Sequence, residues 1–244
     1  MKHVAIITGA SRGIGAAVAQ RLAKDGFAVV VNYASNVAEA DKVVAAIIAN
    51  GGAAIAIQAD VAKSADVRRL FDATIAQLGR VDVLVNNAGI MPSQLPQLAA
   101  TDDDTFDRLV AVNLKGSFNT MREAATRLEQ GGRIINFSSS LVGTLLPGYS
   151  AYVATKGGIE GMTTILAKEL RGKNITVNAV APGPTATALF LDGKTPELIE
   201  RLAKMAPLER LGMPDDIANS VSFLAGPDGS WINGQTLRAN GGMV

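Results

Sequence analysis

The chain has 244 residues, 48% of them hydrophobic, and its 23 Lys and Arg against 22 Asp and Glu give a formal net charge of +1. This balance provides no global field for nucleic acid or an acidic membrane, so neither is expected as a partner. Cysteine is absent and His3 is the only histidine. These counts exclude disulfides and thiolate catalysis, disfavour a histidine triad, and lead us to expect no metal.

Short apolar segments alternate with longer segments of helical periodicity along the whole chain. The predicted strands cover residues 4–8, 28–33, 53–59, 81–87, 133–139, 175–182 and 234–239, and the predicted helices cover about 13–25, 36–50, 64–78, 105–129, 150–172 and 214–225. Almost wholly apolar strands separated by helices are typical of a parallel sheet covered on both faces. We therefore predict an α/β chain, a single-domain doubly wound Rossmann fold over residues 1–244, with a seven-stranded, mostly parallel sheet.

Two further expectations concern the beginning of the chain and its longest loop. Residues 1–3 lead directly into the first apolar segment, and no segment approaches the roughly 20 apolar residues of a membrane span, so we expect a cytoplasmic protein. The segment about 184–212 interrupts the strand–helix alternation and contains a short amphipathic helix. Loops of this length often act as substrate lids, although an ordinary surface excursion is the alternative.

The segment TGASRGIG, residues 8–15, follows the first predicted strand and opens the first helix. Its glycines permit a tight turn, and the helix N-terminus offers N–H groups and a positive dipole to a pyrophosphate. The spacing G-x-x-x-G-x-G differs from the G-x-G-x-x-G dinucleotide fingerprint, so a plain strand-to-helix turn is the alternative. Its position after the first strand favours dinucleotide binding.

The end of the second predicted strand, VVVNYASN, indicates which dinucleotide. An NAD site would carry an acidic residue here for the ribose hydroxyls, but this position holds Asn32 and the next acidic residue is Glu39. Arg12, with Asn32, Ser35 and Asn36, can instead bind a 2′-phosphate. We predict NADP(H) as the cofactor, with a merely solvated Arg12 as the alternative.

Tyr152 and Lys156 lie four positions apart near the start of a predicted helix, so their side chains share one face. Ketone reduction requires a hydride at carbon and a proton at oxygen. A free tyrosine titrates near pH 10, and a nearby cation stabilises its anion. The pair can therefore supply the proton, although a buried ring beside a solvated ammonium is the alternative.

Six motifs follow one another along the chain: TGASRGIG, NNAG at 86–89, Asn113 in VAVNLKGSF, SSS at 138–140, Tyr152-x-x-x-Lys156, and PGPTAT at 182–187. Together they resemble the short-chain dehydrogenase/reductase family over the whole chain. The resemblance implies that Ser139, 13 residues before Tyr152, holds the carbonyl oxygen. It also implies that Asn113 holds a water beside Lys156, whose ammonium binds the nicotinamide ribose.

The same resemblance implies a set of cofactor-binding residues at the carboxyl ends of the strands. Asp60 and Val61 resemble the adenine-binding pair, although they can equally cap the next helix, and Asn87 can brace the sheet instead. The predicted set is Gly9, Ser11, Arg12, Gly13, Ile14, Gly15, Asn32, Tyr33, Ser35, Asp60, Val61, Asn87, Ala88, Gly89, Tyr152, Lys156, Pro182, Gly183, Thr185 and Thr187.

An apolar group of residues near Ser139 and in the long loop is the candidate substrate pocket: Leu141, Val142, Leu145, Leu146, Tyr149, Pro184, Leu189, Phe190 and Met205. No cation among them demands a carboxylate or a phosphate. We predict a small-molecule substrate, a neutral ketone, aldehyde or β-keto ester, although each residue can equally belong to the core.

Two other functions remain open. A 3-oxoacyl-(acyl-carrier-protein) reductase needs basic surface near the mouth of its site. Here Glu129 lies between Arg127 and Arg133 and reduces the positive charge of that segment. Arg171 and Lys173 retain some positive charge. A regulator that binds NADP(H) without turnover needs no proton relay. The resemblance also implies a homotetramer. Arg238 and Asn240 in LRANGG replace the family's more frequent pattern, and the sequence offers no physical account of them.

Overall fold

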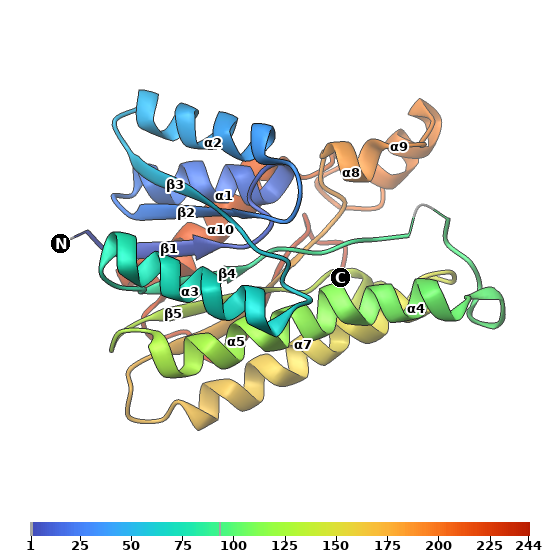
Figure 1. Ribbon diagram of the computed structural model, residues 1–244. Coiled ribbons are helices and arrows are strands. Elements are labelled where there is room, and N and C mark those ends of the chain that lie inside the picture. Colours follow the sequence, from blue (N-terminus) through green and yellow to red (C-terminus); the bar gives the residue numbers. More distant parts are fainter. Residues whose placement is uncertain (1, 93) are drawn as a thin grey trace.

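The computed structural model describes residues 2–92 and 94–244, except for the side chain of Leu189. Seven strands form one sheet in the order β3-β2-β1-β4-β5-β6-β7, and every neighbouring pair is parallel (Figure 1). The strands are β1 (Val4–Ile7), β2 (Ala28–Tyr33), β3 (Ala53–Gln58), β4 (Val83–Asn86), β5 (Arg133–Phe137), β6 (Thr176–Pro182) and β7 (Thr236–Ala239). The predicted doubly wound sheet is confirmed, and all of its pairings are parallel.

Helices cover both faces of this sheet. They are α1 (Gly13–Lys24), α2 (Val37–Ala49), α3 (Ser64–Leu78), α4 (Asp103–Leu109), α5 (Gly116–Arg127), α6 (Leu141–Thr144), α7 (Ser150–Glu169), α8 (Ala188–Leu191), α9 (Pro196–Ala203) and α10 (Pro214–Ala225). Figure 1 shows α3, α5 and α7 on one side of the sheet and α1, α2 and α10 on the other. Ala5 and Ile7 of β1 pack into one core, whereas Val4 and Ile6 pack into the other. Burial on both faces explains why the strands are apolar without alternation.

The predicted helix over 105–129 is not continuous. Between α4 and α5 the chain forms a π-helical segment, Val110–Lys115, in which the N–H of Gly116 bonds the carbonyl of Ala111, five residues earlier. The long loop also differs from the prediction, because residues 184–212 contain two short helices, α8 and α9, rather than one. The π segment matters for function because it contains Asn113.

A buried polar network fixes α5 and α7 against the centre of the sheet. Asn86 of β4 donates its amide to the Asn136 side chain of β5 at 2.8 Å. Asn136 in turn donates to Thr163 of α7 at 2.8 Å, and Thr120 of α5 donates to Asn86 at 2.5 Å. Buried amides are stable only when paired in this way. The network therefore sets the position of α7, which carries Tyr152 and Lys156.

Candidate active site

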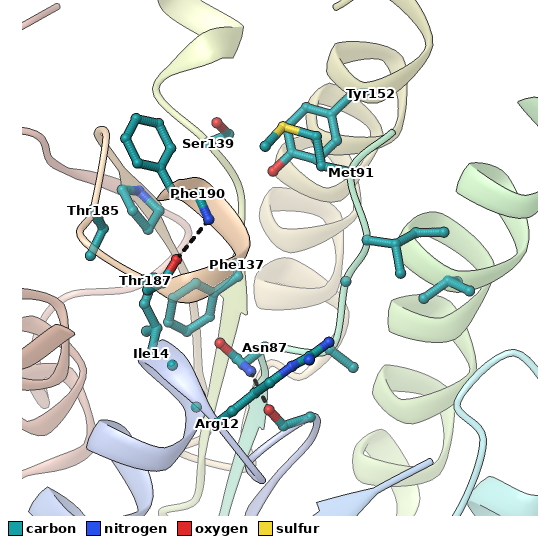
Figure 2. Close-up of a pocket in the computed structure, with 18 of the residues that line it drawn as sticks. Arg12, Ile14, Asn87, Met91, Phe137, Ser139, Tyr152, Thr185, Thr187 and Phe190 are labelled. Carbon is teal, nitrogen blue, oxygen red and sulfur yellow. Dashed lines mark hydrogen bonds between the residues drawn. The ribbon is translucent and has the colours of Figure 1, made fainter. Parts of the chain in front are cut away.

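A cavity of about 710 Å³ lies along the carboxyl ends of the parallel strands, and it runs from the glycine loop after β1 to Tyr152 on α7 (Figure 2). Open parallel sheets bind their ligands at this edge. Its position and elongated lining are those expected for a dinucleotide with a second small molecule at one end.

The glycine loop is shaped for close approach to a ligand. Gly9 has φ +62°, and a Cβ there would lie 2.9 Å from the Cα of Ala88. A Cβ on Gly15 would lie 2.5 Å from both the Gly9 carbonyl oxygen and the Asn87 side chain. The loop thus requires glycine at both positions, and its conformation leaves the N-terminus of α1 facing the cavity. These features fit a bound pyrophosphate.

Two asparagine side chains hydrogen-bond to this loop. Asn87 donates to the carbonyls of Thr8 at 2.9 Å and Gly9 at 3.0 Å. The Asn32 oxygen accepts from the Gly9 N–H at 3.3 Å, and its nitrogen donates to the Ala59 carbonyl at 3.1 Å. Asn32 is also almost completely buried. Both side chains therefore serve mainly to stabilise the loop. The sequence analysis gave this structural role as an alternative for Asn87, but it predicted only cofactor binding for Asn32.

The opposite end of the cavity holds the three side chains of the predicted chemistry. Lys156 is buried and donates its ammonium to the Phe137 carbonyl at 2.8 Å. The same Nζ lies 5.7 Å from the centre of the Tyr152 ring. Ser139 hydrogen-bonds to Tyr152 and accepts from the backbone N–H of Leu141 at 3.2 Å. Figure 2 shows Ser139 and Tyr152 at the same end of the cavity.

Burial perturbs both titratable groups of this pair in opposite directions. It raises the pKa of Tyr152 to about 12, against the opposing effect of the Ser139 hydrogen bond, and Tyr149 adds a smaller increase. Burial also lowers the pKa of Lys156 to about 8. Near pH 7 the phenol is therefore protonated and the ammonium charged. The phenol can therefore donate a proton, but its pKa lies above the neutral range that favours a general acid, and the lowering expected from Lys156 is not among the causes of its shift.

Asn113 lies in the π segment and reaches this site indirectly. Its side chain accepts from the Ile90 N–H at 2.8 Å and donates to the Ile90 carbonyl at 3.0 Å. A Cβ on Gly89 would lie 3.3 Å from the Asn113 oxygen and 3.7 Å from Lys156 Nζ. Asn113 therefore fixes the loop after β4 beside the lysine, although it is not among the residues that line the cavity.

The structure brings the predicted cofactor residues together. All of them line the cavity, from Gly9 to Thr187, and so do five predicted substrate residues: Leu141, Leu146, Tyr149, Pro184 and Phe190. Val142, Leu145 and Met205 are not in its lining, and Leu145 turns away with 68% of its surface exposed. The side chain of Leu189 lies outside the described part of the chain.

Sequence reasoning missed several lining residues, among them Met91, Leu202 and Met243. Met91 follows NNAG closely, and that position could have identified it. Met243 carried no such signal. In residues 2–92 and 94–244 the structure contains no cluster of side chains suited to a metal ion and no helix long and apolar enough to cross a membrane.

Comparison with known proteins assigns the chain to a family. A family model described as enoyl-(acyl carrier protein) reductase matches residues 9–244. A short-chain type dehydrogenase/reductase of Picea abies is 49% identical over 99% of this chain and 92% of its own length. An NADPH-dependent aldehyde reductase-like chloroplastic protein of Arabidopsis thaliana is 46% identical over 99% and 94%.

Two further matches bear on cofactor and substrate. The 3-oxoacyl-(acyl-carrier-protein) reductase FabG of Staphylococcus aureus is 43% identical over 100% of this chain and 98% of its own. The structure of a Burkholderia cenocepacia short-chain dehydrogenase in complex with NADP superposes with a TM-score of 0.92 at 39% identity, covering 99% and 97%. Matches of this extent and identity leave one conclusion, that the chain belongs to the short-chain dehydrogenase/reductase family.

Proposed function

We propose that the protein is an NADPH-dependent reductase of neutral ketones, aldehydes or β-keto esters, and that it can also run the reverse oxidation of a secondary alcohol. The observation that carries this proposal is the group of buried Ser139 and Lys156 with half-buried Tyr152 at one end of a cavity whose other end is the glycine loop. NADPH, when bound, supplies the hydride. The remaining chemistry belongs to the side chains of this chain.

Tyr152 acts as the general acid. Its phenol, protonated at neutral pH, gives its proton to the oxygen of the carbonyl substrate, while the hydroxyl of Ser139 holds that same oxygen. The buried ammonium of Lys156 stabilises the phenolate that remains, and an electrostatic contact of this kind is strong because water is excluded. Asn113 keeps the loop after β4 beside the lysine through its two bonds to Ile90. Its part in a water-mediated proton relay is carried into the proposal from the family resemblance.

NADPH is proposed over NADH because β2 ends without a carboxylate, and Glu39, which lines this part of the cavity, is paired with Lys42 at 2.7 Å. Arg12, Ser35 and Asn36 are exposed at this part of the cavity, and all three line it. A guanidinium can bind a 2′-phosphate with two parallel hydrogen bonds. Support also comes from the Arabidopsis and Burkholderia relatives, whose names carry NADPH and NADP.

Reduction of 3-oxoacyl groups on acyl carrier protein is the second candidate, favoured by the identity to the staphylococcal enzyme. Two of the basic residues considered for docking of the carrier protein lie away from the cavity. Arg133 begins β5, and Arg127 ends α5 and pairs there with Glu123 at 3.1 Å, so both lie at the amino edge of the sheet, opposite the cavity.

The surface that does lie beside Tyr152 is acidic. Tyr152 shares a small hollow with Thr101 and Thr105 at the start of α4. Asp103, Asp104 and Asp107 of the same helix are exposed and outnumber its one basic residue, Arg108, which is also exposed and lines the cavity. Like charges disfavour docking of an acidic carrier protein. We therefore rank free neutral carbonyl compounds first.

Segment 184–212 is proposed as the substrate lid, because Phe190 of α8 and Leu202 of α9 line the cavity.

We also propose a homotetramer. Trp231 is 95% exposed close to β7, an edge strand, and Phe118 of α5 and Ile165 of α7 are also exposed. Light scattering on the purified protein tests the assembly. A cytoplasmic location stays a prediction, and the Arabidopsis relative is named as a chloroplastic protein.

The proposed activity is tested by following cofactor oxidation with NADPH and NADH in parallel, against butanone, a β-keto ester and a 3-oxoacyl thioester. We expect NADPH-dependent turnover of the free carbonyl compounds. Tyr152→Phe should lower kcat by about 10²- to 10⁴-fold and leave NADPH binding nearly intact. Undiminished turnover by that variant would contradict the chemistry, and a strong preference for the thioester on acyl carrier protein would promote the second candidate.

A further inference from the structure

The segment 240–244, NGGMV, returns from β7 to the active site. The backbone N–H of Gly183 bonds the Ala239 carbonyl at 3.0 Å as the segment begins. A Cβ on Gly183 would lie 2.8 Å from the Cβ of Asn240, and a Cβ on Gly143 would lie 2.9 Å from the side chain of Val244. The segment is therefore packed tightly against two loops that line the cavity.

Asn240 makes the contacts that hold this segment in place. Its amide nitrogen donates to the Ser140 hydroxyl at 2.9 Å, and Ser140 donates onward to the Ala181 carbonyl at 3.0 Å. Its amide oxygen accepts from the backbone N–H groups of Gly242 at 3.0 Å and Met243 at 3.2 Å. One side chain thus joins the residue after Ser139 to the backbone of Met243.

This arrangement holds Met243 in the lining of the cavity. It is half-buried and lies with Leu141, Leu146 and Tyr149 among the lining residues. The adjacent Gly241 also accepts from the Leu208 N–H at 3.3 Å, which joins the segment to the end of the proposed lid. The segment therefore contacts the catalytic-serine loop on one side and the lid on the other.

We propose that Met243 is a specificity-determining residue, the wall of the pocket that contacts the apolar substituent of the carbonyl substrate, and that Asn240 is the positioning residue that places it. This inference rests on the proposed carbonyl reduction. An unbranched thioether adapts its shape to an aryl or alkyl group and packs favourably against aromatic rings. The pocket accordingly favours carbonyl compounds that carry a bulky apolar group.

The kinetic test compares kcat/KM for acetophenone with that for butanone at saturating NADPH. Met243→Ala should lower the acetophenone-to-butanone ratio about tenfold, because one missing apolar contact in a pocket changes discrimination by that order. Met243→Leu, similar in volume, should preserve it. Met213→Ala is the matched control, since this exposed methionine lies outside segment 184–212 and is not in the cavity lining, and the ratio should not change.

The positioning role of Asn240 is tested by a double-mutant cycle. Asn240→Ala should lower the same ratio, and in a Met243→Ala background it should have no further effect, because it acts through Met243. Asn240→Asp retains both backbone acceptor contacts and should rescue the ratio to within about twofold, a rescue that a general loss of stability would not give. Effects that simply add in the double variant would overturn the positioning role.

A second measurement does not depend on turnover or on the folding of an Asn240 variant. With methyl-¹³C methionine in the NADP⁺-bound protein, the Met243 resonance, assigned by its absence in Met243→Leu, should shift on addition of acetophenone, while that of Met213 should not. An unmoved Met243 resonance and an unchanged ratio overturn the inference while ketone reduction stands. A shifted resonance without reduction of either ketone, of an aldehyde or of a β-keto ester supports the contact of Met243 with the apolar group and refutes the proposed function.

Discussion

The charge state of Lys156 leads to a pH dependence that can be worked out from the structure. Burial lowers the pKa of this lysine from 10.5 to about 8. The charged fraction should then fall from about nine-tenths at pH 7 to about one-tenth at pH 9. Because only the ammonium stabilises the phenolate of Tyr152, kcat/KM for ketone reduction should fall about tenfold over the same interval.

The assay is the initial rate of NADPH oxidation at saturating cofactor, across about pH 6 to pH 10. Loss of the native fold would not explain the decline through these groups. The lowered pKa of Lys156 means that the unfolded chain binds more protons between about pH 8 and 10.5, so this lysine's contribution to stability rises with pH there. The raised pKa of Tyr152 has the opposite effect, but only from about pH 10 upward.

Lys156→Met is the matched variant, which should be slow at every pH and should lose the step near pH 8. A wild-type profile that stays flat to about pH 10, in protein whose NADPH affinity is unchanged, would refute the reasoning. It would mean that the lysine keeps its proton in the working enzyme or that its charge is not needed.

Three other substitutions test the cofactor site and its support. Gly15→Ala places a methyl group 2.5 Å from the Gly9 carbonyl oxygen and should weaken NADPH binding at least about tenfold. An unchanged affinity measured by calorimetry would show that the loop can shift to accommodate the methyl group. Arg12→Ala should raise the Kd for NADPH by about 10- to 100-fold with little effect on NADH, and equal losses for both would remove Arg12 from the 2′-phosphate site. Asn136→Leu leaves the buried Asn86 and Thr163 without their partner, so urea unfolding should show a loss of about 2–4 kcal/mol, and a neutral result would mean that the network is dispensable.

The sequence allowed the sheet to be predicted because burial on both faces makes each strand a continuous apolar segment. The predicted strand over 28–33 and the predicted helices over 64–78 and 214–225 match the structure in both bounds. The predicted cofactor residues all line one cavity because they lie at strand ends, where a parallel topology brings them together. These features depend on local pattern and on topology, and both can be read from one chain.

Other features depend on side-chain contacts that no pattern encodes. Asn32 occupies the position expected for a ribose contact. Its side chain instead accepts a hydrogen bond from the Gly9 N–H and donates one to the Ala59 carbonyl. Asn240 had no account from the sequence, because its partner Ser140 lies 100 residues earlier. The exposed Leu145 was apolar enough for a pocket but sits at φ 51°, where the chain turns to solvent. Apolar periodicity gives no orientation for such residues.

The π-helical turn around Asn113 also has a consequence for how the sequence can change. An α-helix advances about 100° per residue, so one additional residue in a single turn rotates everything after it by that angle. Thr120 faces the buried Asn86 in the resulting phase. Deleting Ala111 would restore a regular helix and swing the Thr120 hydroxyl away from the sheet. The turn is thus a one-residue insertion on which the downstream half of the helix now depends, and insertions or deletions in 110–115 should be tolerated far less than substitutions on its exposed side.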